Sequence, residues 1–221
     1  MTGESLLLLA WTLYFGLHSL LAADGVKRRL SAKLPRLASC YRLGYNLVAL
    51  ITLLPIIWIH TAYPAHMLWQ WQGAASVVAQ GFTLAALLGF AWSLKYYDMA
   101  AFSGIRAGLR RDAEKTQDSF TLSPLHRHVR HPWYLFALII LWSRDQNSLT
   151  LISSVMISVY LFLGSRLEER KLLRAFGRRY GDYMARVPGI IPLPWRRLSA
   201  AEARALTRRS PPAADADRWS G

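Results

Sequence analysis

Two short charged blocks hold the residues of this sequence whose types suit binding or catalysis. The first block contains Arg130, His131, Pro132 and Tyr134. Proline fits the first turn of a helix, so Arg130 and His131 should directly precede a helix N-terminus, which favours anionic groups. The block predicts a place for a carboxylate or a phosphate. The same residues also fit an ordinary basic flank of a membrane segment with an interfacial tyrosine.

The second block contains two adjacent carboxylates, Glu168 and Glu169, among basic residues. The carboxylates repel one another, so their pairing needs a physical reason. A bound cation or the hydroxyls of a ribose would supply one, and so would ion pairs with neighbouring arginines. Binding and structural ion pairing are equally good readings of the pair alone.

Long apolar runs determine the expected fold. The chain has 221 residues, of which 53% are hydrophobic and 18% charged. Five apolar segments follow one another: Ser5 to Ala23, Tyr45 to Ala62, Val77 to Leu94, Pro132 to Ser143 and Leu149 to Gly164. The first three approach the ~20 residues that cross a bilayer, and the last two are shorter. We predict an all-α integral membrane helical bundle with about five transmembrane helices, the last two forming a tight hairpin. That hairpin would bring both charged blocks to one side of the membrane.

The positions of the basic residues predict the orientation. All but one of the 27 Lys and Arg residues fall on one side of this arrangement, and Arg144 is the exception. By the positive-inside rule the N-terminus lies outside and the C-terminus is cytoplasmic. The net charge of +14 is then explained by attraction to anionic membrane lipids, and no nucleic acid partner is expected. Residues 1–198 form one membrane domain, and residues 199–221 are expected to be a disordered cytoplasmic tail.

The histidines give weaker signals. The spacing of His126, His128 and His131 invites a metal site, but no cysteine or acidic ligand lies close in the sequence, so none is predicted. His18 and His60 fall within or near membrane segments, where an ionisable group is a functional candidate. For His60 we favour a bond to a backbone carbonyl or an interfacial position. For His18 the functional and the structural interpretations stay open.

The ordered set of motifs resembles the isoprenylcysteine carboxyl methyltransferase and phospholipid methyltransferase group of membrane enzymes. The motifs are Arg130-His131-Pro132-x-Tyr134, Glu168-Glu169-x-x-Leu172, Phe176-Gly177-x-x-Tyr180-x-x-Tyr183 and Val187-Pro188. The N-terminal half is similar to a bacterial branch that contains methanethiol S-methyltransferases and NnrU-like accessory proteins of nitric oxide reductase operons. The shared elements there are Leu17-His18-Ser19, Lys27-Arg28-Arg29 and Trp69-Gln70-Trp71.

The resemblance implies an S-adenosyl-L-methionine site at the cytoplasmic face of a bacterial inner membrane protein. Arg130 and Glu168 would be catalytic, and the cofactor would be bound by His128, Arg130, His131, Pro132, Tyr134, Glu168, Glu169 and Tyr180. Two positions differ from the family pattern. Phe136 stands where the family often has Gly, and Pro124-Leu125-His126 stands where it often has Gly-Pro-Tyr. Both differences concern the shape of the pocket.

The expected function is therefore S-adenosyl-L-methionine-dependent methyl transfer to a lipophilic acceptor or to a small thiol or carboxyl compound. Such transfer depends on positioning and water exclusion more than on strong acid and base groups. The alternative is a non-catalytic, NnrU-like accessory membrane protein of a respiratory complex.

Overall fold

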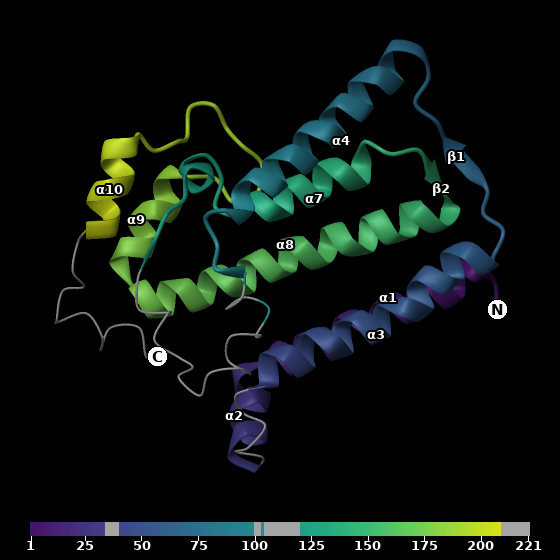
Figure 1. Cartoon of the computed structure of the whole chain (residues 1–221), viewed down its shortest axis with the longest axis horizontal. Helices are drawn as coiled ribbons and strands as arrows, with labels where there is room; N and C mark the ends of the chain where they lie inside the picture. Colours follow the sequence, from purple (N-terminus) through teal and green to yellow (C-terminus); the bar gives the residue numbers. More distant parts are fainter. Residues whose placement is uncertain (34–39, 100–102, 104–119, 209–221) are drawn as a thin grey trace.

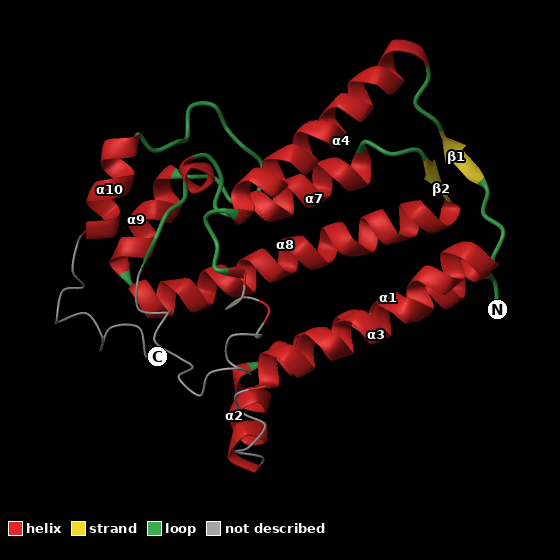
Figure 2. Cartoon of the chain, in the orientation of Figure 1, coloured by secondary structure: helices red, strands yellow, loops and turns green. Residues whose placement is uncertain are grey.

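The computed structural model describes residues 1–33, 40–99, 103 and 120–208, which are mainly helical (Figures 1 and 2). The long helices are α1 (Gly3–Ala22), α3 (Tyr41–Ala62), α4 (Gly73–Leu94) and α8 (Ser148–Phe176). The shorter helices are α2 (Asp24–Lys33), η2 (Pro124–Arg127), α7 (Pro132–Trp142), α9 (Arg178–Arg186) and α10 (Ala200–Arg208). Two short strands, β1 (Met67–Trp69) and β2 (Gln146–Asn147), pair antiparallel.

Four helices, α1, α3, α4 and α8, are long and apolar enough to cross a membrane. Large apolar side chains on their outer faces are exposed, for example Leu50 at 64% and Leu88 at 62%, as expected for surfaces in contact with lipid. The chain is thus built as an integral membrane protein. Helix α7 has 11 residues, so it is only about 16 Å long and is shorter than a hydrocarbon core of about 30 Å. The number of crossings and their orientation stay predictions.

Helices α1 and α8 run parallel, and polar contacts join them in step from one end to the other. The contacts are Glu4 with Ser148, Trp11 with Ser153 and Ser19 with Tyr160. Asp24, the first residue of α2, pairs with Lys171 further along α8. Helix α3 packs against α1, and a buried core of Leu7, Trp11, Ile56, Ile59 and Leu149 joins all three helices. Because the contacts recur along the whole length, the relative register of α1 and α8 is fixed.

The ends of α8 follow from local sequence. Asn147 accepts a hydrogen bond from the backbone N–H of Thr150, and the Thr150 hydroxyl accepts one from the backbone N–H of Asn147. This capping box starts the helix. Gly177 ends it with a φ of 52°, which favours glycine. The helix therefore carries Glu168 and Glu169 on the same rigid rod as the apolar residues of the membrane segment.

Helix α7 lies between α4 and α8 (Figure 1). Phe136 of α7 packs against Gly89 of α4, because a Cβ atom at Gly89 would lie 2.8 Å from the Cζ of Phe136. The residue that differs from the family pattern is thus accommodated by a glycine on the neighbouring helix.

The C-terminal region differs from the expected disordered tail. Residues 200–208 form helix α10, whose Ala203 and Leu206 are buried in a cluster with Phe120, Tyr180 and Tyr183. Residues 209–221 lie outside the described part of the chain.

We expect Gly89→Ala to destabilise the protein by about 1–3 kcal/mol, because the added methyl group overpacks the contact with Phe136. Thermal unfolding in detergent micelles measures this effect. Gly81→Ala on the same helix is the matched control, since a Cβ there meets nothing within 4 Å. Equal midpoints for the two variants would contradict the packing described.

Candidate functional site

The two charged blocks meet where α7 begins and α8 nears its end. Pro132 is the first residue of α7, as the sequence predicts, and His131 is its N-cap residue. Glu168 and Glu169 lie about two turns before the end of α8. Contacts between the side chains of the two blocks confirm that they face each other.

Arg130 and Glu169 form the centre of the site. The Nε and Nη2 atoms of Arg130 lie 2.8 Å and 2.7 Å from Oε1 of Glu169. Nη1 of Arg130 donates to the backbone carbonyls of Met184 and Val187. The guanidinium thus joins α8 to the segment that follows α9.

His131 completes this buried group. Its Nε2 lies 3.0 Å from the same Oε1 of Glu169, and its ring stacks on Tyr134 with centroids 5.1 Å apart. The backbone N–H groups of Arg130 and His131 both donate to the carbonyl of Gly189. We call Arg130, His131 and Glu169 the buried ion cluster.

Burial limits what the ion cluster can bind directly. The side chains of Arg130, His131 and Glu169 are 9%, 5% and 4% exposed. Three nitrogen atoms converge on one carboxylate oxygen, so Glu169 is largely occupied by its protein partners. The arrangement suits Arg130 and Glu169 to positioning more than to direct contact with a ligand.

Glu168 has the opposite environment, although it is the next residue. Its side chain is 51% exposed. The Tyr134 hydroxyl donates to its Oε2 at 3.3 Å, and Nδ1 of His131 lies 3.6 Å from the same oxygen. We call Glu168 and Tyr134 the accessible edge. It offers a carboxylate, a hydroxyl and an aromatic face to a ligand.

Tyr180 lies in the packed core next to the site. The ring is 2% exposed and packs edge-on against Phe120 and Tyr183. Burial raises the pKa of its hydroxyl above the usual value, and the nearby Glu169 adds to the shift. Tyr183 donates to the carbonyl of His126 at 2.7 Å. The predicted cofactor contact of Tyr180 thus falls on a side chain enclosed by packing.

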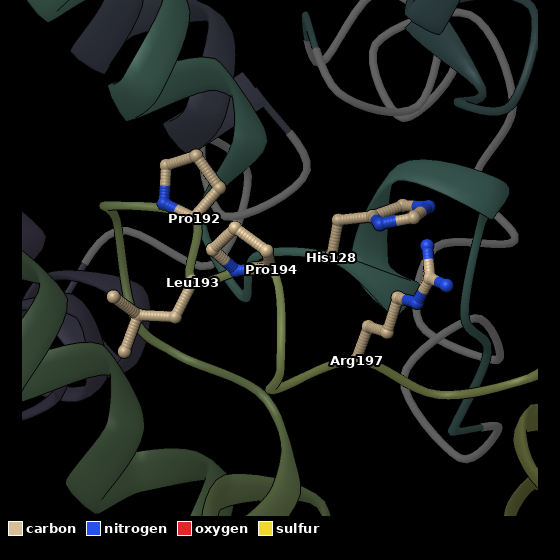
Figure 3. A pocket seen from close by; sticks show the side chains of 5 residues that line it. All are labelled: His128, Pro192, Leu193, Pro194 and Arg197. Carbon is tan, nitrogen blue, oxygen red and sulfur yellow. The ribbon is translucent and has the colours of Figure 1, made fainter.

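His128 points elsewhere. It lines a separate pocket of about 290 Å³ together with Pro192, Leu193, Pro194 and Arg197 (Figure 3). His126 binds Ser123 and Tyr97, whereas His131 binds Glu169. The three histidines of the sequence motif therefore face different partners.

The backbone carbonyls of Met184, Val187, Pro188 and Gly189 are the site groups that the sequence did not reveal. Backbone groups leave no side-chain signal. The sequence signal that pointed to this segment was the Val187-Pro188 motif, which is shared with the membrane methyltransferase group. A Cβ at Gly189 would lie 3.5 Å from Nη2 of Arg130, so this glycine lets the chain pass close to the ion cluster.

Comparison with known proteins identifies the family. The NnrU protein family matches residues 6–175, which include both charged blocks. The chain belongs to the NnrU family. It is also similar to methanethiol S-methyltransferase 2 of Bradyrhizobium diazoefficiens, with 32% identity over 86% of this chain and 74% of that protein.

Two further relatives of this NnrU-family chain are named methanethiol S-methyltransferase. The protein from Mycobacterium tuberculosis is 29% identical over 81% of this chain and 74% of its own length. The protein from Pseudomonas deceptionensis is 26% identical over 82% of this chain and 70% of its own length. No solved structure matches the chain significantly.

We expect Glu169→Ala to lower the free energy of unfolding of this NnrU-family protein by about 3 kcal/mol or more, because it leaves the buried Arg130 without its counter-charge. Glu168→Ala should change it by less than about 1 kcal/mol, since that side chain is half exposed. Denaturant unfolding in micelles compares the two variants. Equal losses would contradict the different roles of the adjacent carboxylates.

We expect the stability of the protein to depend on pH through His126. Burial lowers the pKa of its imidazole from 6.5 to about 4, with a smaller contribution from His131. The unfolded chain therefore binds more protons between these values, so stability falls as the pH drops from 6.5 towards 4. The loss should reach up to about 3 kcal/mol. The difference between wild type and His126→Gln across this range measures it, and identical pH profiles would refute the assignment.

Proposed function

We propose that this chain is an integral-membrane methyltransferase that uses S-adenosyl-L-methionine to methylate a small thiol. The observation that carries the proposal is the similarity to proteins named methanethiol S-methyltransferase, with 32% identity over 86% of the chain in one case. The charged blocks supply polar groups suited to a methyl donor.

The chemistry of the accessible edge fits this donor. The exposed carboxylate of Glu168 can accept hydrogen bonds from an ammonium group or from ribose hydroxyls. The aromatic ring of Tyr134, which stacks on His131, can contact adenine or the positively charged sulfonium. When bound, the donor supplies a methyl group on a positively charged sulfur.

The ion cluster holds the accessible edge in place. Glu169 binds both Arg130 and His131, and His131 in turn stacks on Tyr134. Ordering these groups before the ligand arrives reduces the entropy lost on binding. In this role Arg130, His131 and Glu169 are positioning residues, whereas Glu168 and Tyr134 contact the donor.

Methyl transfer requires the acceptor sulfur to approach the methyl carbon in line with the bond that breaks. Correct placement of two reactants is worth about 7–11 kcal/mol of the barrier in favourable cases. The site lies at the ends of apolar helices, so a small apolar thiol can reach it from the bilayer.

The proposal predicts that Glu168→Ala weakens donor binding by about tenfold or more, which corresponds to about 1.4 kcal/mol. Isothermal titration calorimetry with the purified full chain and S-adenosyl-L-methionine measures this. Glu202→Ala is the matched control, because Glu202 is similarly exposed and pairs with Arg186 away from the site. Absence of donor binding by the wild type, even at millimolar concentration, would overturn the proposal.

A second candidate function is that of a non-catalytic accessory membrane protein. The match of residues 6–175 to the NnrU protein family favours it. Under this alternative the purified chain binds no methyl donor and is recovered from membranes in a stable complex with another protein. Donor binding that depends on Glu168 would exclude it.

A further inference from the structure

A histidine inside the membrane segment of α1 has an incomplete set of hydrogen bonds. His18 lies about one turn before the end of α1. Its Nε2 is hydrogen-bonded to the hydroxyl of Tyr45 on α3. Its Nδ1 is buried and finds no partner among the residues that the structure describes. A buried polar atom without a partner is destabilising, so its presence calls for an explanation.

His60 provides a useful contrast within the same protein. It also lies in a membrane segment, and its Nε2 is 2.9 Å from the hydroxyl of Ser153. Ser153 also accepts from the indole N–H of Trp11. The hydrogen bonds of His60 thus join α1, α3 and α8, which accounts for it structurally. No comparable network reaches Nδ1 of His18.

Aromatic rings surround His18. The ring centroids of Tyr14, Tyr45 and Tyr160 lie 5.7, 4.7 and 6.0 Å from that of the imidazole. Phe15 stacks on Tyr160 with ring centroids 4.1 Å apart. We call Tyr14, His18, Tyr45 and Tyr160 the His18 cluster. The rings form apolar surroundings, and Nδ1 of His18 is the polar atom among them that finds no partner in the described part of the chain.

The His18 cluster is connected to the accessible edge along one face of α8. Tyr160, Gly164 and Glu168 are spaced four residues apart, so they lie one above another on that face. The Tyr134 hydroxyl donates to Glu168 and lies 3.9 Å from the position of a Cβ at Gly164. Eight residues of helix separate Tyr160 from Glu168 by about 12 Å. The cluster therefore lies deeper in the membrane than the proposed donor site and adjoins it.

We propose that Nδ1 of His18 is the general base that accepts the proton of the acceptor thiol. This inference rests on the proposed function. In the tautomer that this role requires, Nε2–H donates to the Tyr45 hydroxyl oxygen and Nδ1 carries a free lone pair. The thiolate is the reactive form of a thiol, so removing the proton activates the acceptor.

The S–H bond of the thiol breaks and its proton passes to Nδ1. The sulfur lone pair forms the new S–CH₃ bond, while the bond between the methyl carbon and the donor sulfonium breaks. The electron pair of that bond returns to the donor sulfur, which becomes a neutral thioether. The imidazolium then loses its proton to water.

The test compares two acceptors of different acidity. We expect His18→Gln to slow transfer to an alkanethiol, which is largely protonated at neutral pH, by about 100-fold or more. Transfer to an aromatic thiol that is already ionised should change little, because it needs no base. Gln retains a group able to bond Tyr45 but cannot accept a proton. His60→Gln is the matched control and should affect both acceptors equally.

A second measurement needs neither a variant nor the methyl donor. Adding ethanethiol to the wild-type protein with ¹⁵N-labelled histidine should shift the Nδ1 resonance of His18 and leave His60 unchanged. An unshifted His18 resonance, or an equal loss of rate for both thiols in His18→Gln, would overturn the role of His18. A wild-type protein that binds no donor and methylates neither thiol would instead overturn the proposed function, and this inference with it.

Discussion

The buried ion pair between Arg130 and Glu169 is the interaction on which the site depends. A charge taken out of water is costly unless an opposite charge and hydrogen bonds replace the solvent. Here the carboxylate binds Arg130 and His131, and the guanidinium also binds the carbonyls of Met184 and Val187. Three parts of the chain are thereby held together: the two residues before α7, the last turns of α8, and the end of α9 with the residue that follows it. Loss of the pair would release all of them at once.

The long helices connect the ion cluster rigidly to the membrane segments. Helix α8 carries Glu168 and Glu169 near one end and is joined to α1 along its length by contacts such as that of Trp11 with Ser153. Glu168 and the Tyr160 side of the His18 cluster therefore occupy fixed positions on one helix. Under the proposed function, the charged donor would bind at the end of the bundle and the apolar acceptor among the aromatic rings.

Much of the architecture was predictable, because long apolar runs are easily recognised in the sequence. The expected hairpin between the two charged blocks also implied that they would lie on the same side. The different roles of Glu168 and Glu169 were not. Adjacent helical residues point about 100° apart, and tertiary packing decides which one is buried. Helix α10 was missed because its burial depends on contacts with Phe120 and Tyr180, which lie far away in the sequence. The separate pocket of His128 and the packing of Phe136 on Gly89 likewise depend on tertiary contacts.

The most direct test of the account is to follow the methyl group itself. The full chain, reconstituted in lipid vesicles, would be given methanethiol and S-adenosyl-L-methionine with a deuterated methyl group. Mass spectrometry of the volatile products should detect dimethyl sulfide carrying one deuterated methyl group, and its yield should fall in Glu168→Ala. Wild-type vesicles that release no labelled thioether, although the protein is folded and the donor is present, would contradict the assignment of the charged site to methyl transfer.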